Sequence, residues 1–254
     1  MFVAAGAHLL NTVRFGQGPR TFVAHGGWVG SWELWQEPFE LMESTWTCIA
    51  YDHRGSGAST APPQAVHPQG LVDDLFAVLD HFDVDACVIA GESMGGLTVL
   101  AAVLQQPQRF TGMVLVDAVT ATSGERRDLS AVREHYPEYV KAFVDACVPE
   151  PDSDHIRRWG RQILMRADPE AAARMLDTHD SPALVPDLGA VTVPTLVIHG
   201  ECDAIVPVNV GVSTAAAIPG AELVVIPGAG HVPTMTRPRE IVDAIDAWAA
   251  RLPD

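Results

Sequence analysis

The sequence predicts an α/β fold in which helices cover both faces of a mostly parallel sheet. Short apolar segments typical of buried strands alternate along the chain with amphipathic helical patterns. Glycine-rich or polar motifs follow several of the apolar segments, at the strand ends where open parallel sheets bind ligands. The alternation stops between residues 120 and 188. We therefore expect one sheet with a helical insertion.

Composition limits the class of protein. The chain has 254 residues, 48% of them hydrophobic, which suits a single sizeable core. Its formal net charge of -16 opposes binding to nucleic acid or to an anionic membrane, and we expect neither partner. The first ten residues lack the basic leading region of a secretion signal. We expect a soluble cytoplasmic protein.

The first part of the chain reads as strands separated by turns, followed by a helix. Apolar segments predict strands at 9–15, 21–25 and 47–51, with a helix near 35–44 before the last of them. Leu71, Leu75, Val78 and Leu79 then recur at helical spacing with acids between them. Residues 70–80 are therefore expected to form a helix over one face of the sheet.

The most informative motif is a serine between glycines, at residues 91–96 (Gly-Glu-Ser-Met-Gly-Gly). It follows an apolar run at 86–90 and precedes an apolar helical pattern at 97–104, so it joins a strand to a helix through a tight turn. A G-x-S-x-G sequence in this context presents the serine hydroxyl on a sharp, strained turn. Ser93 is therefore the candidate nucleophile.

A serine nucleophile needs a histidine to take its proton and a carboxylate to orient that histidine. Beyond a further strand at 112–116, the apolar segment 194–200 ends in a polar turn that contains Asp203. The next strand, 222–226, ends in a glycine-containing loop that leads to His231. Asp203 is the candidate acid and His231 the candidate base. Asp117, which ends the strand at 112–116, is the rival to Asp203.

Four motifs in this order resemble the α/β-hydrolase fold, in its compact esterase, lactonase and carbon–carbon hydrolase type. The resemblance extends over about residues 23–248. The motifs are residues 25–28 (His-Gly-Gly-Trp), residues 52–59 (Asp-His-Arg-Gly-Ser-Gly-Ala-Ser), the serine turn, and the paired Asp203 and His231 turns. The order Ser, Asp, His matches that of this fold.

The resemblance implies a small helical cap, inserted after the sixth strand and lying over the active site. We assign residues 120–188 to this cap, and residues 1–119 and 189–254 to the two parts of the core, which together form one domain. The cap is the expected source of specificity. Aromatic and apolar cap residues either line an acyl pocket or pack within the cap: Tyr136, Tyr139, Phe143, Trp159, Ile163, Leu164 and Met165.

The resemblance also implies two backbone N–H groups that stabilise a negative oxygen, an oxyanion hole. One comes from Met94, the residue after the nucleophile. In similar enzymes the second comes from the position occupied here by Gly27. Because this loop is one residue longer than the commonest pattern, Trp28 stays open as the donor.

Several other conspicuous residues are expected to be structural. His25 orients its loop by hydrogen bonds, and the motif around His53 and Arg54 forms a braced turn in the family. His199 ends a buried strand and is expected to be a core histidine. Cys202 lies beside the candidate acid and is expected to be an inert thiol packed behind the turn.

No cofactor or metal is expected. The ten histidines are scattered without the spacing of a zinc site, and the sequence contains neither G-x-G-x-x-G nor a P-loop. The four cysteines are far apart and form no C-x-x-C pair. They are expected to be buried reduced thiols, with Cys48 and Cys87 inside strands.

These observations favour a serine hydrolase that cleaves a small carboxylic ester or lactone through an acyl-enzyme. The alternatives are hydrolysis of a carbon–carbon bond in a vinylogous diketone, a cofactor-free perhydrolase, and a ligand-binding sensor on the same fold. A serine nucleophile excludes the aspartate-dependent haloalkane dehalogenase and epoxide hydrolase branches. The expected partner is a small acyl compound, and a homodimer stays open.

Overall fold

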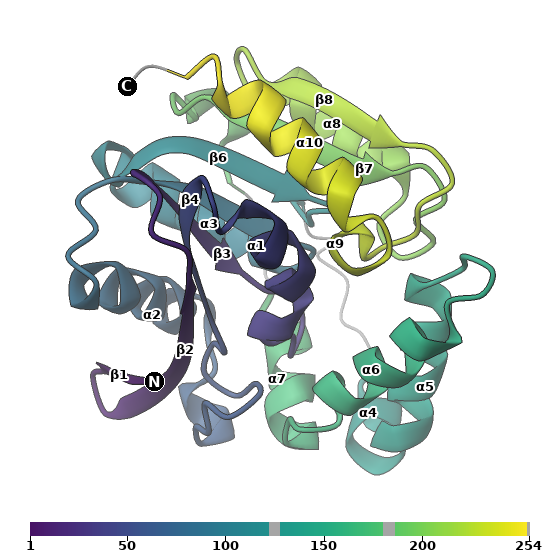
Figure 1. Cartoon of the computed structure of the whole chain (residues 1–254). Coiled ribbons are helices and arrows are strands. Elements are labelled where there is room, and N and C mark those ends of the chain that lie inside the picture. The colour runs from purple at the N-terminus through teal and green to yellow at the C-terminus, as the bar shows by residue number, and fades with distance from the viewer. Residues whose placement is uncertain (122–127, 180–185, 253–254) are drawn as a thin grey trace.

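The computed structural model describes residues 1–121, 128–179 and 186–252. Its sheet has eight strands in the order β1-β2-β4-β3-β5-β6-β7-β8 (Figure 1). The β1–β2 and β2–β4 pairs are antiparallel and the other pairs are parallel, which confirms the predicted fold class. The strands are β1 (Phe2–Ala5), β2 (His8–Phe15), β3 (Arg20–His25), β4 (Trp46–Tyr51), β5 (Cys87–Glu92), β6 (Phe110–Val116), β7 (Thr195–Gly200) and β8 (Glu222–Ile226).

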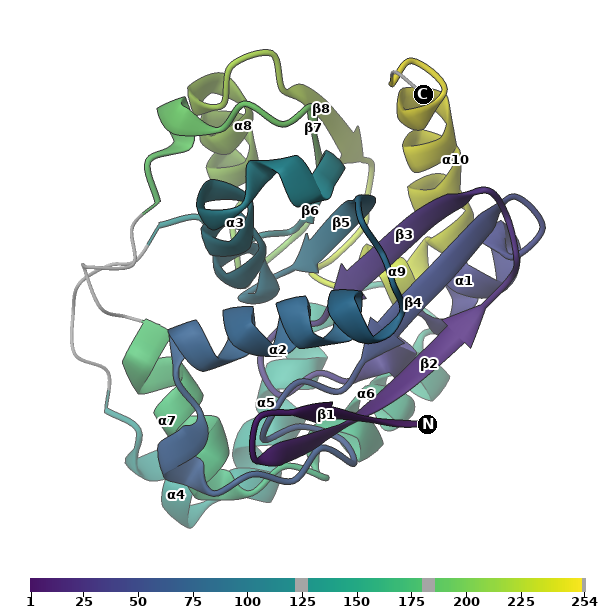
Figure 2. The ribbon, with the colours of Figure 1, turned by 90° about the vertical axis from the view of Figure 1, so that its left-hand side faces the viewer.

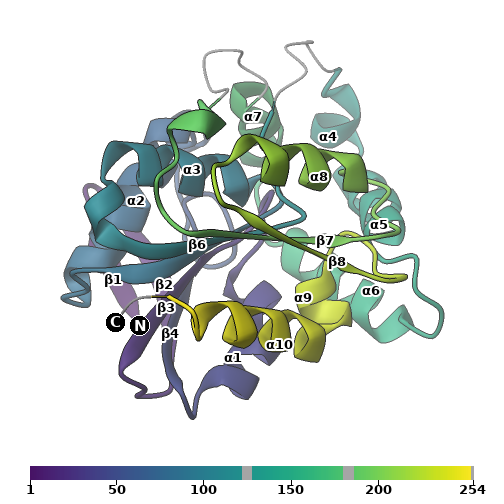
Figure 3. The same cartoon turned by 90° about the horizontal axis from the view of Figure 1, so that it is seen from above.

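Helices cover both faces of this sheet. Seen from above, α2, α3 and α8 lie on one face, and α1 and α10 lie on the other (Figure 3). Their bounds are α1 (Gln36–Met42), α2 (Pro68–His81), α3 (Gly95–Gln105), α8 (Val208–Ala217), the short α9 (Pro233–Thr236) and α10 (Pro238–Ala249). Short 3₁₀ turns occur at Trp32–Trp35, Pro63–Ala65, Pro107–Arg109 and Leu188–Ala190.

The two covered faces give two apolar cores, because successive side chains of a strand point to opposite faces. In β3, Phe22 packs in the cluster that contains Phe39 of α1 and Ile245 of α10. Its neighbour Val23 packs in the cluster that contains Leu75 of α2. The central strands are therefore buried on both sides, as their continuous apolar sequences predict.

In the described part of the chain between β6 and β7, where the cap is predicted, there are four α-helices. They are α4 (Ser130–Glu134), α5 (Tyr136–Cys147), α6 (Asp154–Leu164) and α7 (Pro169–His179), and they group together below the sheet in Figures 1 and 2. Prolines separate them: Pro137 lies in the first turn of α5, and Pro169 begins α7. Parts of the predicted cap, 122–127 and 180–185, lie outside the described residues, and its boundaries stay a prediction.

The first strand is absent from the sequence prediction. β1 pairs with β2 through a turn in which Gly6 has a φ of 60°. Val3 and Ala5 are buried and alternate with exposed Phe2 and Ala4, so the two-residue period of a strand is present. The alternation is hidden in the sequence because the exposed positions are also apolar.

The turn after β4 is braced as expected. The Asp52 carboxylate accepts hydrogen bonds from the backbone N–H groups of Trp32 (3.0 Å) and Ala58 (2.8 Å). The Arg54 guanidinium binds both carboxylate oxygens of Asp74 in α2, at 2.7 and 2.6 Å, and Asp74 is fully buried. This pairing raises the pKa of Arg54. The predicted structural role of this motif is confirmed.

A second buried acid ends β5, directly before the candidate nucleophile. The Glu92 side chain is 1% exposed, and burial raises its pKa to about 8. The hydroxyl of Thr234 donates to Oε1 at 3.0 Å, whereas Oε2 has no partner in the structure. Glu92 is therefore a neutral carboxylic acid in the folded protein at neutral pH.

Removing Asp74 should destabilise the fold strongly, because it leaves the buried Arg54 charge without its carboxylate partner. Breaking a buried ion pair in this way costs about 3–5 kcal/mol. We expect Asp74→Ala to lose free energy of unfolding in this range in urea titrations, and Asp73→Ala, at an exposed neighbour on α2, to change it by less than about 0.5 kcal/mol. Equal effects of the two substitutions would contradict this account.

The stability of the protein should depend on pH through Glu92. An unfolded glutamate releases its proton near pH 4.5, whereas the folded protein retains it to about pH 8, so the folded state binds more protons between these values. The contribution of Glu92 to stability is complete below pH 4.5 and is lost as the pH rises through 8. Relative to Glu92→Gln, the wild type should become progressively less stable over this range. A stability difference that is constant with pH would contradict the shifted pKa.

Candidate active site

Ser93 lies in the sharp turn between β5 and α3, with a backbone φ of +53° that is uncommon for a residue other than glycine. Its N–H donates to the carbonyl of Val116 at 2.9 Å, and its carbonyl accepts from Val119 at 2.8 Å. A Cβ added to Gly95 would lie 2.6 Å from the Gly26 carbonyl oxygen. A residue with a side chain at position 95 would therefore collide with the loop after β3, so the close packing of this loop on the serine turn requires a glycine.

The structure brings the other two predicted residues to Ser93. Nε2 of His231 lies 2.8 Å from Ser93 Oγ, and Nδ1 lies 2.7 Å from Oδ2 of Asp203. Oδ1 of Asp203 accepts the N–H groups of Ile205 and Val206 at 2.7 and 2.9 Å, which fixes the carboxylate. With Nδ1–H donating to Asp203, the lone pair on Nε2 faces the serine hydroxyl. This is the tautomer that a general base requires.

Asp117 lies close by but has a different role. Its Oδ1 accepts the Gly200 N–H at 2.7 Å, and its Oδ2 has no partner in the structure. Burial and the neighbouring Asp203 charge raise the pKa of Asp117 well above its ordinary value. Among the hydrogen bonds of the described residues, the His231 ring is joined to Asp203 and Ser93, which favours Asp203 as the acid.

His199 is buried between the two acids, as expected for a core histidine. Its Nε2 donates to the Val206 carbonyl at 2.8 Å, and burial lowers its pKa. Asp117, Asp203 and His231 each place one atom capable of binding a metal within 4.8 Å of the others. Nδ1 of His231 carries the proton donated to Asp203, however, and a protonated nitrogen is no metal ligand.

The loop after β3 lies directly against the nucleophile. A Cβ added to Gly27 would approach Ser93 Cβ to 2.9 Å and the Glu92 carbonyl oxygen to 3.2 Å. The Gly27 carbonyl is within 3.0 Å of His53 Nε2, so His53 fixes this loop. His25 bonds the Tyr51 hydroxyl at 2.9 Å, in agreement with its expected structural role.

Gly27, Trp28 and Met94 are the predicted candidates for stabilising an oxyanion, and this role stays a prediction. Within the described part of the chain, the N–H groups of Gly27, Trp28 and Met94 donate no hydrogen bond to another protein group. Gly27 is the residue of the loop packed on Ser93, whereas the Trp28 indole turns toward α7 and donates to the Ala172 carbonyl at 2.9 Å. Of these residues of the β3 loop, Gly27 is thus shown packed against Ser93.

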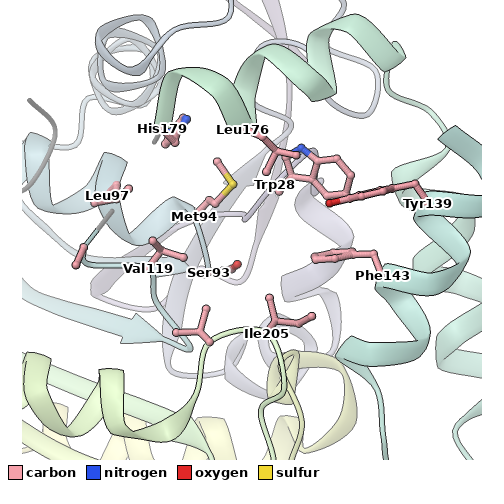
Figure 4. Close-up of a pocket in the computed structure, with 12 residues that line it drawn as sticks. Trp28, Ser93, Met94, Leu97, Val119, Tyr139, Phe143, Leu176, His179 and Ile205 are labelled. Atoms are coloured by element: carbon pink, nitrogen blue, oxygen red, sulfur yellow. The ribbon is translucent and has the colours of Figure 1, made fainter. Parts of the chain in front are cut away.

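A pocket of about 120 Å³ opens at Ser93 (Figure 4). Trp28, Tyr139 and Phe143 form an aromatic wall, with ring centroids of Trp28 and Phe143 5.1 Å apart. Met94, Leu97 and Val119 line the opposite side in Figure 4, with Leu176 and His179 above and Ile205 below. Most of its lining side chains are apolar, although polar atoms form a large part of its surface.

Only part of the predicted cap set reaches this pocket. Tyr139 and Phe143 line it, and Leu164 borders an adjoining cavity of about 40 Å³ next to His231. Tyr136 and Ile163 are buried within the inserted helices, and Met165 is 42% exposed. Leu176 and His179 also line the pocket, and no sequence pattern marks them as pocket residues.

His179 of α7 also lies on the pocket wall. Its Nδ1 donates to the Met175 carbonyl at 2.7 Å, one turn earlier in α7, and burial lowers its pKa to about 4. The ring is therefore neutral at physiological pH. It adds no charge to the pocket, which agrees with the apolar lining.

The cysteines differ from expectation at one position. Cys48, Cys87 and Cys147 are buried free thiols, but Cys202 is exposed. The expectation that Cys202 packs behind the acid turn is wrong, because its neighbour Asp203 turns inward and the thiol points to the surface.

Among the described residues, no helix has both the length and the apolar character needed to cross a membrane.

Known proteins match this chain over most of its length. Residues 22–244 match the family model described as "Alpha/beta hydrolase family". The chain is 28% identical to 3-oxoadipate enol-lactonase 2 of Acinetobacter baylyi, over 95% of this chain and 93% of that protein.

Solved structures match the fold equally broadly. A thermophilic esterase from Thermogutta terrifontis superposes with a TM-score of 0.83 at 25% identity, over 99% of this chain and 98% of that one. The enol-lactonase from Burkholderia xenovorans LB400 superposes with a TM-score of 0.90 at 20% identity, over 99% and 100%. With its sheet, its serine turn and a family match over most of its residues, the chain belongs to the α/β-hydrolase family.

Proposed function

We propose that this hydrolase cleaves a small carboxylic ester or lactone through an acyl-enzyme on Ser93. The observation that carries the proposal is the pair of hydrogen bonds made by the His231 ring, at 2.8 Å to Ser93 Oγ and 2.7 Å to Asp203 Oδ2. A serine hydroxyl is a weak nucleophile, and this arrangement supplies both the base and the group that orients it.

In the first half of the reaction, Ser93 Oγ attacks the carbonyl carbon and its proton passes to Nε2 of His231. Asp203 stabilises the imidazolium that forms, because its fixed carboxylate accepts the proton on Nδ1. The carbonyl oxygen becomes an oxyanion, which accepts hydrogen bonds from Met94 and from Gly27 or Trp28. Loss of one such donor in a studied protease costs about 2.7–4 kcal/mol of transition-state stabilisation.

Collapse of the tetrahedral intermediate then breaks the bond to the leaving oxygen, which takes the proton from Nε2. For a lactone, the leaving alcohol remains attached to the acyl chain. Water, deprotonated by the same nitrogen, attacks the acyl-enzyme, and His231 returns the proton to Ser93 as the carboxylic acid leaves. No step needs a group that the chain does not supply.

The pocket supports a small, uncharged substrate. Its volume of about 120 Å³ is apolar on most sides, and His179 on its wall is neutral. The relative from Acinetobacter baylyi is named as an enol-lactonase, which supports the lactone part of the proposal. Comparing p-nitrophenyl acetate and butyrate, simple lactones and a ring-cleavage dienoate separates ester hydrolysis from carbon–carbon hydrolysis. Turnover of the dienoate with inert esters would contradict the proposal.

Replacing the nucleophile should abolish ester turnover. Ser93→Ala removes the attacking oxygen but leaves the oxyanion donors, and we expect kcat for p-nitrophenyl butyrate to fall by at least about 10⁴-fold. Ser213→Ala, at an exposed serine on α8, serves as the matched control and should retain wild-type kcat. Substantial ester turnover by Ser93→Ala would contradict a covalent serine mechanism and leave the binding-sensor alternative in place.

The aromatic wall should limit the length of the acyl chain. Phe143 packs on Trp28 and borders the pocket, so Phe143→Ala should lengthen the cavity on that side. We expect kcat/KM for p-nitrophenyl octanoate relative to butyrate to rise by about 10-fold, as one to two extra methylene groups gain apolar contact. Met165→Ala, at an exposed side chain directly after α6, should leave this ratio unchanged. If the ratio is unchanged in Phe143→Ala, the acyl chain does not extend toward Phe143, and the prediction is contradicted.

A further inference from the structure

The connection between α5 and α6 contacts the loop that carries His231. The Cys147 carbonyl accepts the backbone N–H of His231 at 2.8 Å. Oε1 of Glu150 accepts two more hydrogen bonds, from the Gly230 N–H at 2.9 Å and from the Thr236 hydroxyl at 2.8 Å. The inserted helices therefore hold the chain before, at and after the candidate base.

This contact depends on a glycine. A Cβ added to Gly230 would lie 2.3 Å from Cδ of Pro149 and 2.5 Å from the Cys147 carbonyl oxygen. Any side chain at this position would push the loop away from the connection. The two segments thus pack too closely for a side chain to fit between them at Gly230.

The connection is itself rigidly held. Arg157 of α6 donates to the carbonyls of Val148 at 2.9 Å and Glu150 at 2.7 Å. The same guanidinium pairs with Asp154 at 2.8 Å. Glu150 is only 3% exposed, and its side chain is fixed at both its backbone and its carboxylate end. Glu150 therefore has a restricted position in the fold, unlike a solvent-exposed side chain.

The first part of the same loop is held by the core instead. The Cys202 N–H donates to the Ala229 carbonyl at 2.8 Å, and Glu201 accepts the Gly228 N–H at 2.9 Å. Support by the core thus reaches Ala229 and resumes at Thr234, whose hydroxyl donates to Glu92 at 3.0 Å. Between these two points, the inserted helices accept the N–H groups of Gly230 and His231.

We propose that Glu150 is a positioning residue for the base, holding the backbone of Gly230 and Thr236 so that the His231 ring reaches Ser93 and Asp203 together. The inference rests on the proposed serine mechanism. Both partners of the ring are fixed to the core, so a displaced loop cannot keep both hydrogen bonds. A misplacement of about 1 Å can cost about 10²-fold in rate. The position of the His231 ring therefore depends on the packing of the inserted helices against its loop.

The test compares Glu150→Ala with Glu150→Gln, because glutamine retains a carbonyl oxygen at the accepting position. We expect kcat for p-nitrophenyl butyrate to fall by about 10- to 100-fold in Glu150→Ala with KM within about 2-fold, and to stay within about 3-fold of wild type in Glu150→Gln. Labelling of Ser93 by a fluorophosphonate should slow in parallel, since it also needs the base. Asp152→Asn, at an exposed acid in the same connection, is the control and should match wild type.

Three results would overturn the proposal: wild-type kcat and labelling rate in Glu150→Ala, equal losses in the alanine and glutamine variants, or a rise in KM at constant kcat. If Glu150→Ala does not fold, Thr236→Val and Thr236→Ser take its place. Valine removes one of the two bonds to Glu150 and should lower kcat by about 3- to 10-fold, with serine restoring it. Equal rates in these two variants would also overturn the proposal.

The test of the Glu150 role can be distinguished from the test of the proposed ester substrate. If the wild type hydrolyses none of the esters, the fluorophosphonate labelling rate still measures how well His231 activates Ser93. Slow labelling of Glu150→Ala with inert esters would then support the positioning role and contradict only the substrate class.

Discussion

The left-handed backbone of Ser93 is the constraint on which the site depends. Its φ of +53° directs the hydroxyl away from the sheet, and the turn closes only because Gly91 and Gly95 leave room for neighbouring backbone. A Cβ on Gly91 would lie 2.8 Å from the Gly95 carbonyl oxygen. Hydrogen bonds to Val116 and Val119 hold the strained residue in place. The acid, the base and the loop at Gly27 are all arranged around this one fixed oxygen.

Burial separates the roles of three neighbouring acids. Asp203 accepts two backbone N–H groups and faces the His231 ring, whereas burial raises the pKa of Asp117 well above its ordinary value and that of Glu92 to about 8. The three carboxyl groups therefore lie in different environments, and Asp203 is hydrogen-bonded to the imidazole. When neighbouring carboxyl groups have different surroundings, their pKa values differ, and they can take different roles in one site.

The sequence predicted the sheet and the three central residues because each follows its own apolar strand and carries its own turn signal. It did not show that Phe2 and Ala4 belong to a strand, since both faces of β1 are apolar. The directions of side chains on loops, such as Cys202 at the surface and Asp203 inside, depend on contacts made by distant segments. Glu150 resembles a surface acid between two prolines, and it is buried only because Gly230 packs beside it.

A structure of the protein after reaction with a serine-directed alkyl phosphonate tests the central claim most directly. We predict phosphorus bonded to Ser93 Oγ, the phosphoryl oxygen within hydrogen-bond distance of the N–H groups of Met94 and Gly27, and the alkyl chain against Phe143. An adduct on any other residue, or a phosphoryl oxygen that faces neither N–H group, would contradict the proposed site.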